Sequence, residues 1–238
     1  MTTTLLDFSR RPDLGLCAEI IGDVAGVAEP LGIMPLIVGA FARDLHLLYG
    51  YGIQTLRQTE DIDFALAVPD WSAFGALQAQ LVKTACFSTS PTAPHRLRHR
   101  NGLPIDLVPF GSVETCERKI AWPPRGEVVM DVFGLREAQA TAIDVAFPGG
   151  VLGRVVSLPA LALLKIVCWS DRHYACPRKD AHDLLIILKN YLPAGNQARL
   201  FGEFASWTQE DAFDYESAGA RMLGLDIRAL LDQQGIER

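Results

Sequence analysis

The sequence lacks any apolar run long enough to cross a membrane. The longest, residues 158–169, is interrupted by Lys165 and falls short of the about 20 residues that a membrane-spanning helix needs. Internal repeats, low-complexity linkers and a signal-peptide pattern are also missing. These absences predict a folded cytoplasmic protein that does not insert into a membrane.

Cysteine is scarce and suggests no disulfide framework. The five cysteines are scattered and odd in number, which fits reduced thiols in the cytoplasm. Cys168, His173, Cys176 and His182 follow one another along the chain, but their spacing matches no compact zinc site. Core thiols and surface histidines explain these residues more simply than a metal does.

Positive charge is in deficit. The chain has 22 lysines and arginines against 28 aspartates and glutamates, so its net charge is −6. Such a chain has no general basic field that would hold a long nucleic acid by counterion release. A contact with nucleic acid must therefore use a local patch, whereas a small phosphorylated substrate remains compatible.

Apolar residues, by contrast, are plentiful enough for a sizeable core, at 49% of 238 residues. Their spacing predicts a helix over 14–28, a strand over 34–38 and a helix over 42–49. Gly39-Ala40 joins the strand to the second helix. Such a turn can cradle a phosphate, because small residues let a ligand reach the N–H groups at a helix start, although most such turns are simply tight.

Two aspartates alternate in the next predicted strand. Residues 59–64 read Thr-Glu-Asp-Ile-Asp-Phe, and alternate strand residues face the same side, so Asp61 and Asp63 project together. Ile62 and Phe64 are the apolar partners of a core strand. Like charges this close favour a divalent cation such as Mg²⁺, although the same pattern occurs by chance at solvated strand ends.

A β-hairpin is predicted around residues 100–102. A two-residue loop would mix charged and apolar side chains on both faces of the hairpin. A three-residue loop, whose last residue is a left-handed glycine, pairs Leu97 with Ile105 and Arg96 with Asp106. We therefore predict the three-residue loop.

Asp106 thereby becomes a third carboxylate on the sheet, and its apolar neighbours favour a central strand. Arg96 and Arg98 share its face and suit an anionic acceptor of the reaction. The alternative is a surface hairpin whose Arg–Asp pair contributes less than about 1 kcal/mol.

The chain is predicted to hold two domains. Residues 1–156 form an α+β domain, a small mixed or antiparallel sheet flanked by helices, and residues 157–238 form a helical domain. Asp70 is expected to cap a helix that ends near Lys83. Further strands are predicted over 127–133 and 143–147, and further helices over 158–171, 178–191, 197–207 and 218–231.

These motifs resemble the nucleotidyltransferase superfamily built on the DNA polymerase β-type core. The resemblance rests on Gly39-Ala40, on Asp61 with Asp63, and on the segment around Asp106. The family's turn is commonly Gly-Ser or Gly-Gly, so this chain lacks a hydroxyl there. The head of the domain is also similar to that of CCA-adding enzymes, whose further blocks are not found here.

The helical part is similar to the AbiEii-like group, which includes toxins of toxin–antitoxin systems. The resemblance spans roughly residues 34–191 and implies an Mg²⁺-dependent enzyme that moves a nucleoside monophosphate from an NTP to an acceptor hydroxyl. Asp61, Asp63 and Asp106 would be the catalytic residues and would hold one or two Mg²⁺ ions.

Nucleotide-binding residues are also implied: Gly39, Ala40, Arg43, Thr59, Lys165, Arg172, Lys179 and Asp183. Lys165 and Arg172 are seven residues apart on one helix face, but Lys165 can equally be a lysine at the edge of the core that extends to solvent. Lys179 and Asp183 can be a surface ion pair of about 0.3–0.5 kcal/mol.

Three functions remain open at this point. The leading function is the transfer of a nucleoside monophosphate to an anionic acceptor such as tRNA. An antitoxin encoded elsewhere would be the partner of such an enzyme. A second function is that of a catalytically silent nucleotide-binding module, which the missing hydroxyl beside Gly39 suggests. The third is a nucleotidylyltransferase for small molecules of the aminoglycoside kind, for which an acidic acceptor cleft is expected.

Overall fold

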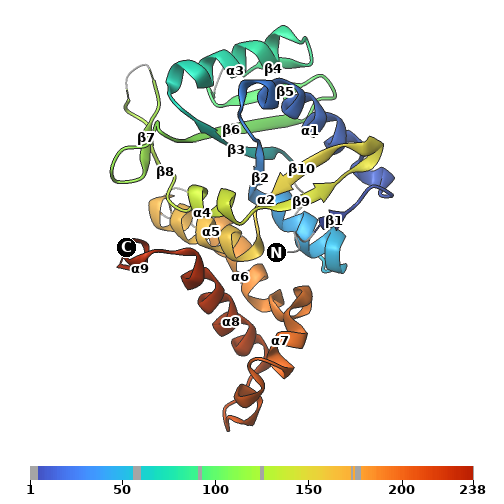
Figure 1. Ribbon diagram of the computed structural model, residues 1–238, viewed down its shortest axis with the longest axis vertical. Coiled ribbons are helices and arrows are strands. Elements are labelled where there is room, and N and C mark those ends of the chain that lie inside the picture. Colours follow the sequence, from blue (N-terminus) through green and yellow to red (C-terminus); the bar gives the residue numbers. More distant parts are fainter. Residues whose placement is uncertain are drawn as a thin grey trace. The chain divides into compact units, whose positions relative to one another are not determined.

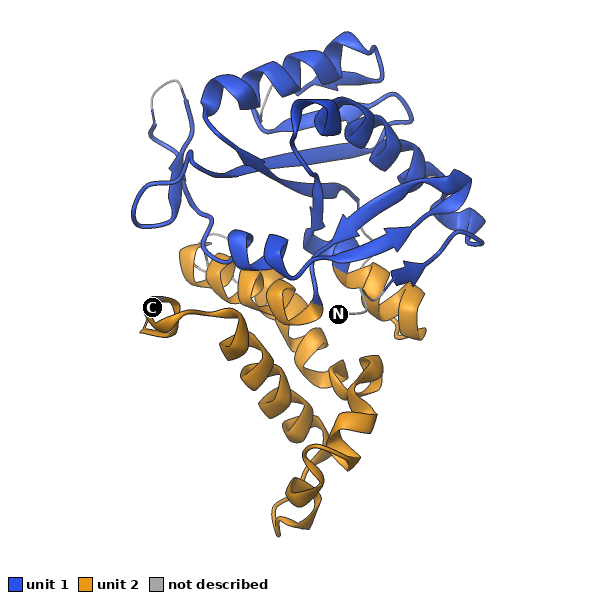
Figure 2. Cartoon of the chain, viewed as in Figure 1, with its two compact units in different colours: residues 1–42, 59–157 blue, residues 43–58, 158–238 orange. Residues whose placement is uncertain are grey.

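The computed structural model describes residues 5–55, 60–90, 93–123, 126–172, 174 and 178–237, and for residues 172 and 234 only the backbone. The chain forms two compact units (Figure 2). Unit 1 comprises residues 1–42 and 59–157, and unit 2 comprises residues 43–58 and 158–238. Whether residues 1–156 and 157–238 fold as separate domains stays a prediction.

Unit 1 is built on a mixed sheet, with the order β1-β9-β10-β2-β3-β6-β5-β4 over the described residues (Figure 1). β3 runs parallel to β6 and antiparallel to β2, and together with the flanking helices this confirms the predicted α+β class. The strands are β1 (Leu5–Asp7), β2 (Leu36–Val38), β3 (Ile62–Val68), β4 (Phe87–Thr89), β5 (Arg96–His99), β6 (Pro104–Gly111), β9 (Ile143–Ala146) and β10 (Leu152–Val155), and β7 (Lys119–Ala121) pairs separately with β8 (Val129–Asp131).

Side chains of β3 alternate between the two faces of the sheet, as the sequence pattern predicts. Phe64 and Leu66 are fully buried, and Phe64 lies on the face toward α1 (Gly15–Ala28), because it lines a pocket together with residues of that helix. α1 packs against α3 (Trp71–Lys83) in unit 1. Asp63, one residue before Phe64, therefore projects from the opposite face.

The hairpin has the predicted register. Leu97 lies opposite Ile105, and Arg96 lies opposite Asp106. Gly102 has φ +94°, the left-handed conformation that a three-residue loop requires at its last position. β6 lies between β3 and β5, so Asp106 belongs to a central strand of the sheet.

The cap of α3 is also confirmed, since a side-chain oxygen of Asp70 accepts a hydrogen bond from the N–H of Ala73 at 2.8 Å. The helix predicted over 42–49 begins earlier, because α2 (Gly39–Asp44) starts directly after β2 and continues as a π-helical segment, Leu45–Gly50.

Unit 2 is helical, as predicted for residues 157–238. The helix expected over 197–207 is interrupted, because the backbone of Gly202 leaves the helical range at φ −107° and ψ −87°. No helix among the described residues is long and apolar enough to span a membrane. The helices are α5 (Leu158–Arg172), α6 (Lys179–Asn190), α7 (Gln197–Phe201), α8 (Tyr215–Leu230) and α9 (Gln233–Glu237), and unit 1 also contains α4 (Leu135–Ala140).

Candidate active site

The register of the sheet places Asp63 directly beside Asp106. In the parallel pair of β3 and β6 these two residues are partners. Val38 of β2 is the partner of Asp63 on the other side, and Arg96 of β5 is the partner of Asp106. Since neighbouring strands lie about 4.8 Å apart, the four residues form one row across the face that Asp63 occupies.

Asp61 completes a cluster of three carboxylates. One oxygen atom from each of Asp61, Asp63 and Asp106 lies within 4.8 Å of the other two, and all three residues are half-buried. Hard carboxylate oxygens are the ligands that Mg²⁺ and Mn²⁺ prefer, and three of them converging on one point are the donor set such an ion needs. The residues present therefore fit a divalent cation.

Arg96 is embedded in this cluster. Its Nε and Nη2 atoms donate to the two oxygens of Asp106 at 2.7 and 2.6 Å, and Nη2 also donates to Asp61 at 2.9 Å. The hydrogen bonds with Asp106 raise the pKa of Arg96 above its ordinary value, against the lowering effect of burial, and the charges of the three aspartates raise it further. Arg96 is therefore charged at every physiological pH.

The Gly39-Ala40 turn touches the carboxylate cluster. Gly39 has φ +71°, and a Cβ atom added to it would lie 1.8 Å from Oδ2 of Asp63. No side chain fits in that space unless Asp63 moves. Ala40, which follows, is buried and lies in the first turn of α2. A glycine is thus required at this position by both the backbone conformation and the neighbouring carboxylate.

Arg43 is fully buried within unit 2. Its guanidinium donates twice to Oδ1 of Asp44, at 2.9 and 2.7 Å, and forms an ion pair with Asp183. Thr55 donates its hydroxyl to the same oxygen of Asp44 at 2.7 Å. Asp44 and Thr55 were not foreseen from the sequence, because only their pairing with a buried arginine distinguishes them from ordinary polar residues.

Lys165 lies in the same buried network. Its ammonium group donates to Asp183 at 2.6 Å and to Asp180 at 3.3 Å, and both carboxylates are fully buried. Lys165 is only 6% exposed, so it does not extend to solvent. Asp180 was missed by the sequence analysis, although it stands three residues before Asp183 and so lies on the same helix face.

The remaining predicted site residues are placed as follows. Lys179 and Arg98 are exposed, and Arg98 donates to the carbonyl of Gly102 at 2.8 Å. Thr59 lies outside the described residues, and so does the side chain of Arg172.

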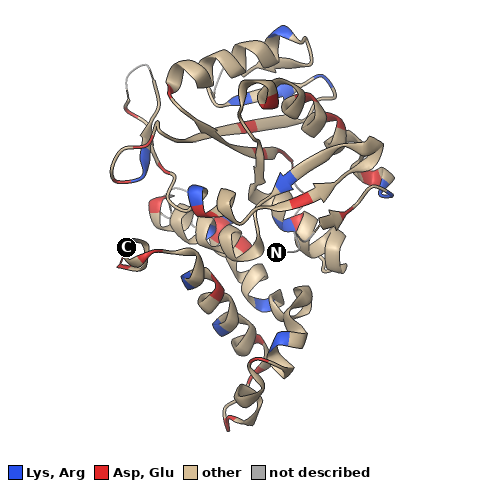
Figure 3. Ribbon diagram, viewed as in Figure 1, with Lys and Arg blue, Asp and Glu red and all other residues tan. Residues whose placement is uncertain are grey.

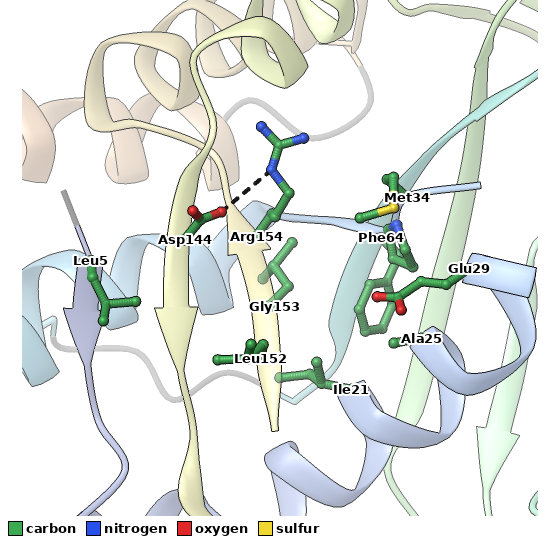
Figure 4. Close-up of a pocket in the computed structure, with 12 residues that line it drawn as sticks. Leu5, Ile21, Ala25, Glu29, Met34, Phe64, Asp144, Leu152, Gly153 and Arg154 are labelled. Atoms are coloured by element: carbon green, nitrogen blue, oxygen red, sulfur yellow. Dashed lines mark ion pairs between the residues drawn. The ribbon is translucent and has the colours of Figure 1, made fainter. Parts of the chain in front are cut away.

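A pocket of about 460 Å³ opens elsewhere in unit 1 (Figure 4). It is mainly apolar, and two of its lining residues, Arg154 and Asp144, form an ion pair at 3.7 Å. None of the three carboxylates of the cluster lines it. The lining residues are Leu5, Ile21, Ala25, Glu29, Met34, Pro35, Ile37, Phe64, Asp144, Leu152, Gly153 and Arg154.

Charged residues of both signs are interspersed along the ribbon of each unit (Figure 3). This distribution agrees with the modest net charge of −6. A phosphorylated ligand would have to be recognised by a local group of residues, because no general basic field is present.

Comparison with known proteins identifies the family. The sequence model described as "Nucleotidyl transferase AbiEii toxin, Type IV TA system" matches residues 36–235. The chain belongs to the AbiEii family. It is therefore a nucleotidyltransferase of a toxin–antitoxin family, which confirms the resemblance seen in its motifs.

Similar solved structures include the antibiotic-resistance factor ANT(2'')-Ia, at 14% identity and TM-score 0.45, covering 82% of this chain and 96% of that one. A nucleotidyltransferase-like protein from Paracoccidioides brasiliensis has 18% identity and TM-score 0.46, with 81% and 90% covered. The CCA-adding enzyme of Thermotoga maritima has 19% identity and TM-score 0.27, with 42% and 21% covered. No curated protein matches the sequence.

Replacement of Gly39 by alanine tests the contact between the turn and the carboxylate. A positive φ alone costs an alanine about 1–2 kcal/mol, and the clash with Asp63 adds to that cost. Gly32→Ala is the matched control, because Gly32 has φ +73° and no atom within 4 Å of an added Cβ. We expect urea unfolding to show a larger loss of stability for Gly39→Ala. Equal losses would contradict the close contact.

Replacement of Asp183 by asparagine tests the buried network of unit 2. The amide would leave two buried cations, Arg43 and Lys165, without their shared carboxylate, and breaking a buried ion pair in this way costs about 3–5 kcal/mol. We expect the free energy of unfolding to fall by that order. Glu216→Gln is the control, because the 3.6 Å pair of Glu216 with Lys189 is exposed and should contribute little. A variant as stable as the wild type would show that the network is not stabilising.

Proposed function

We propose that this protein transfers a nucleoside monophosphate from an NTP to a hydroxyl group of an acceptor, in a reaction that depends on Mg²⁺. The observation that carries the proposal is the convergence of Asp61, Asp63 and Asp106, whose ligand oxygens lie within 4.8 Å of one another. Membership of the AbiEii family supports the reaction class. In such a transfer the acceptor oxygen forms a bond to the α-phosphorus, and the bond between the α- and β-phosphates breaks to release pyrophosphate.

The three carboxylates have related roles in this proposal. Asp61 and Asp63 would hold the metal on the side of the triphosphate, and Asp106 would complete the site toward the attacking hydroxyl. Bound Mg²⁺ would neutralise the phosphates and lower the pKa of the attacking hydroxyl, and one or two ions suit this chemistry. The protein's own contribution is to hold three carboxylates, and hence the substrates, in fixed positions.

The turn at Gly39 and Ala40 is proposed to receive the phosphates. Without a serine hydroxyl, its contribution would come from backbone N–H groups. Because Gly39 has no side chain, the turn lies directly against the carboxylate of Asp63, which brings the two parts of the proposed site together. Thr59 remains a candidate by resemblance. The full burial of Arg43 favours a positioning role at the end of α2 rather than direct contact with a phosphate.

For unit 2, the assignment of nucleotide binding to Lys165, Arg172, Lys179 and Asp183 remains a proposal that rests on resemblance. Lys165 and Asp183 are held by buried ion pairs, which would keep both side chains in one geometry. Lys179 is exposed and would be free to contact a phosphate.

The acceptor is proposed to be anionic, such as the end of a tRNA. Arg98 is exposed on β5 and Arg96 lies beside the carboxylates, so both are candidates for contact with an acceptor phosphate. An antitoxin protein is proposed as the partner that restrains the activity, because the family is one of toxin–antitoxin systems.

The test is to incubate the protein with each α-³²P-labelled NTP, with Mg²⁺, and with separate pools of tRNA, protein and aminoglycosides. We expect label to enter the tRNA pool, and both EDTA and Asp63→Asn to reduce the transfer by about a hundredfold or more, because fixed charge stabilisation is lost. Asp144→Asn is the matched control, since it removes an exposed carboxylate from β9 of the same sheet.

Each alternative has its own outcome. If label enters only the aminoglycoside pool, the acceptor is a small molecule and not tRNA. If no NTP is consumed or bound, the chain is a silent member of the family and the proposed activity is wrong. If Asp63→Asn transfers label as fast as the wild type, the assignment of the metal site is wrong.

A further inference from the structure

Arg96 occupies the carboxylate oxygens that a metal ion would need. Its guanidinium is bonded to both oxygens of Asp106 and to one oxygen of Asp61. These contacts join three different strands or strand ends, since Asp61 precedes β3, Asp106 lies on β6 and Arg96 lies on β5. The cluster thus already contains a cation that belongs to the chain.

A divalent ion and this guanidinium compete for the same oxygens. The guanidinium takes a lone pair on each oxygen of Asp106 and on one oxygen of Asp61. Mg²⁺ binds carboxylate oxygens at 2.0–2.1 Å and requires strict geometry, so it competes with the guanidinium for these atoms. The two cations also repel each other at this range. At the same time, three carboxylates face one guanidinium, so the four side chains retain an excess of negative charge that still attracts a cation.

The surroundings of Arg96 allow it to leave. Its side chain is 36% exposed, whereas the carboxylates that it bridges are 20% and 14% exposed. Arginine is charged in either position and gains solvation when it moves toward water, which offsets part of the loss of its ion pairs. A triphosphate would offer the released guanidinium anionic oxygens in the planar geometry that it prefers.

We propose that Arg96 is the resident counter-cation of the metal site. Arg96 holds Asp61 and Asp106 together while no metal is bound, and it weakens the binding of a free divalent ion. When the ion binds together with an NTP, the guanidinium leaves the two carboxylates. Tight metal binding thereby becomes conditional on the nucleotide. This inference rests on the metal site of the proposed function.

The test measures the affinity for Mn²⁺ of the full-length protein by the electron paramagnetic resonance signal of the free ion. Wild type, Arg96→Gln and Arg98→Gln are compared. Arg98 is the matched control, because it lies on the same strand and face, carries the same charge, and bonds to the carbonyl of Gly102 instead of a carboxylate. Arg96→Lys keeps the charge but loses the bidentate geometry.

Without nucleotide, we expect Arg96→Gln to bind Mn²⁺ about tenfold more tightly than the wild type, because a competing cation in direct contact has been removed. Arg98→Gln should change the affinity about twofold or less, since its charge is screened by solvent. Arg96→Lys should lie between wild type and Arg96→Gln. A non-hydrolysable NTP analogue should tighten binding to the wild type and narrow its difference from Arg96→Gln.

Equal or weaker Mn²⁺ binding by Arg96→Gln than by the wild type overturns the inference and makes Arg96 a residue that positions the carboxylates. Equal tightening in Arg96→Gln and Arg98→Gln also overturns it, because the effect would then be one of general charge. If neither wild type nor Arg96→Gln binds Mn²⁺ while thermal melting shows both folded, the metal site of the proposed function fails as well. The two failures are thus distinguishable.

Discussion

The parallel pairing of β3 with β6 is the constraint on which the candidate site depends. A slip of one residue would turn either aspartate toward the opposite face, because side chains alternate along a strand. The register is set from that opposite face, where Phe64 and Leu107 are partners and both are fully buried. Burial of each such side chain contributes about 1.5–3 kcal/mol. The repulsion of two carboxylates about 5 Å apart is about 3 kcal/mol at an effective dielectric constant of 20, so the apolar face can offset it.

Two features of unit 1 shape the cluster locally. Arg96 bridges Asp106 and Asp61, and so reduces the negative charge of the cluster without removing it. Gly39 lets the backbone of the turn approach Asp63 more closely than any other residue would allow. The result is a group of acidic side chains held together before any ligand binds, which is the preorganisation that electrostatic catalysis requires.

Much of this arrangement is local in the sequence, and that part could be predicted. The register of the hairpin followed from face counting between Leu97 and Ile105, and the cap at Asp70 followed from residue type. Non-local pairings could not be predicted from periodicity, which links no two distant partners, and only the family resemblance indicated that Asp106 meets Asp61 and Asp63. The partnership of Asp63 with Asp106 depends on a crossover connection between parallel strands, and the ion pair of Arg43 with Asp183 joins residues 140 positions apart. The short edge strand β1 was missed because three residues carry too little pattern.

We propose above that Asp61, Asp63 and Asp106 form one divalent-metal site. Its most direct test is a crystal structure of the protein soaked with Mn²⁺ and a non-hydrolysable NTP analogue, with anomalous scattering measured to locate the ion. We predict an anomalous peak about 2.0–2.3 Å from carboxylate oxygens of these residues, with the guanidinium of Arg96 moved off Asp61. A bound analogue with no peak among the three carboxylates, or with the manganese held by other residues, would contradict it.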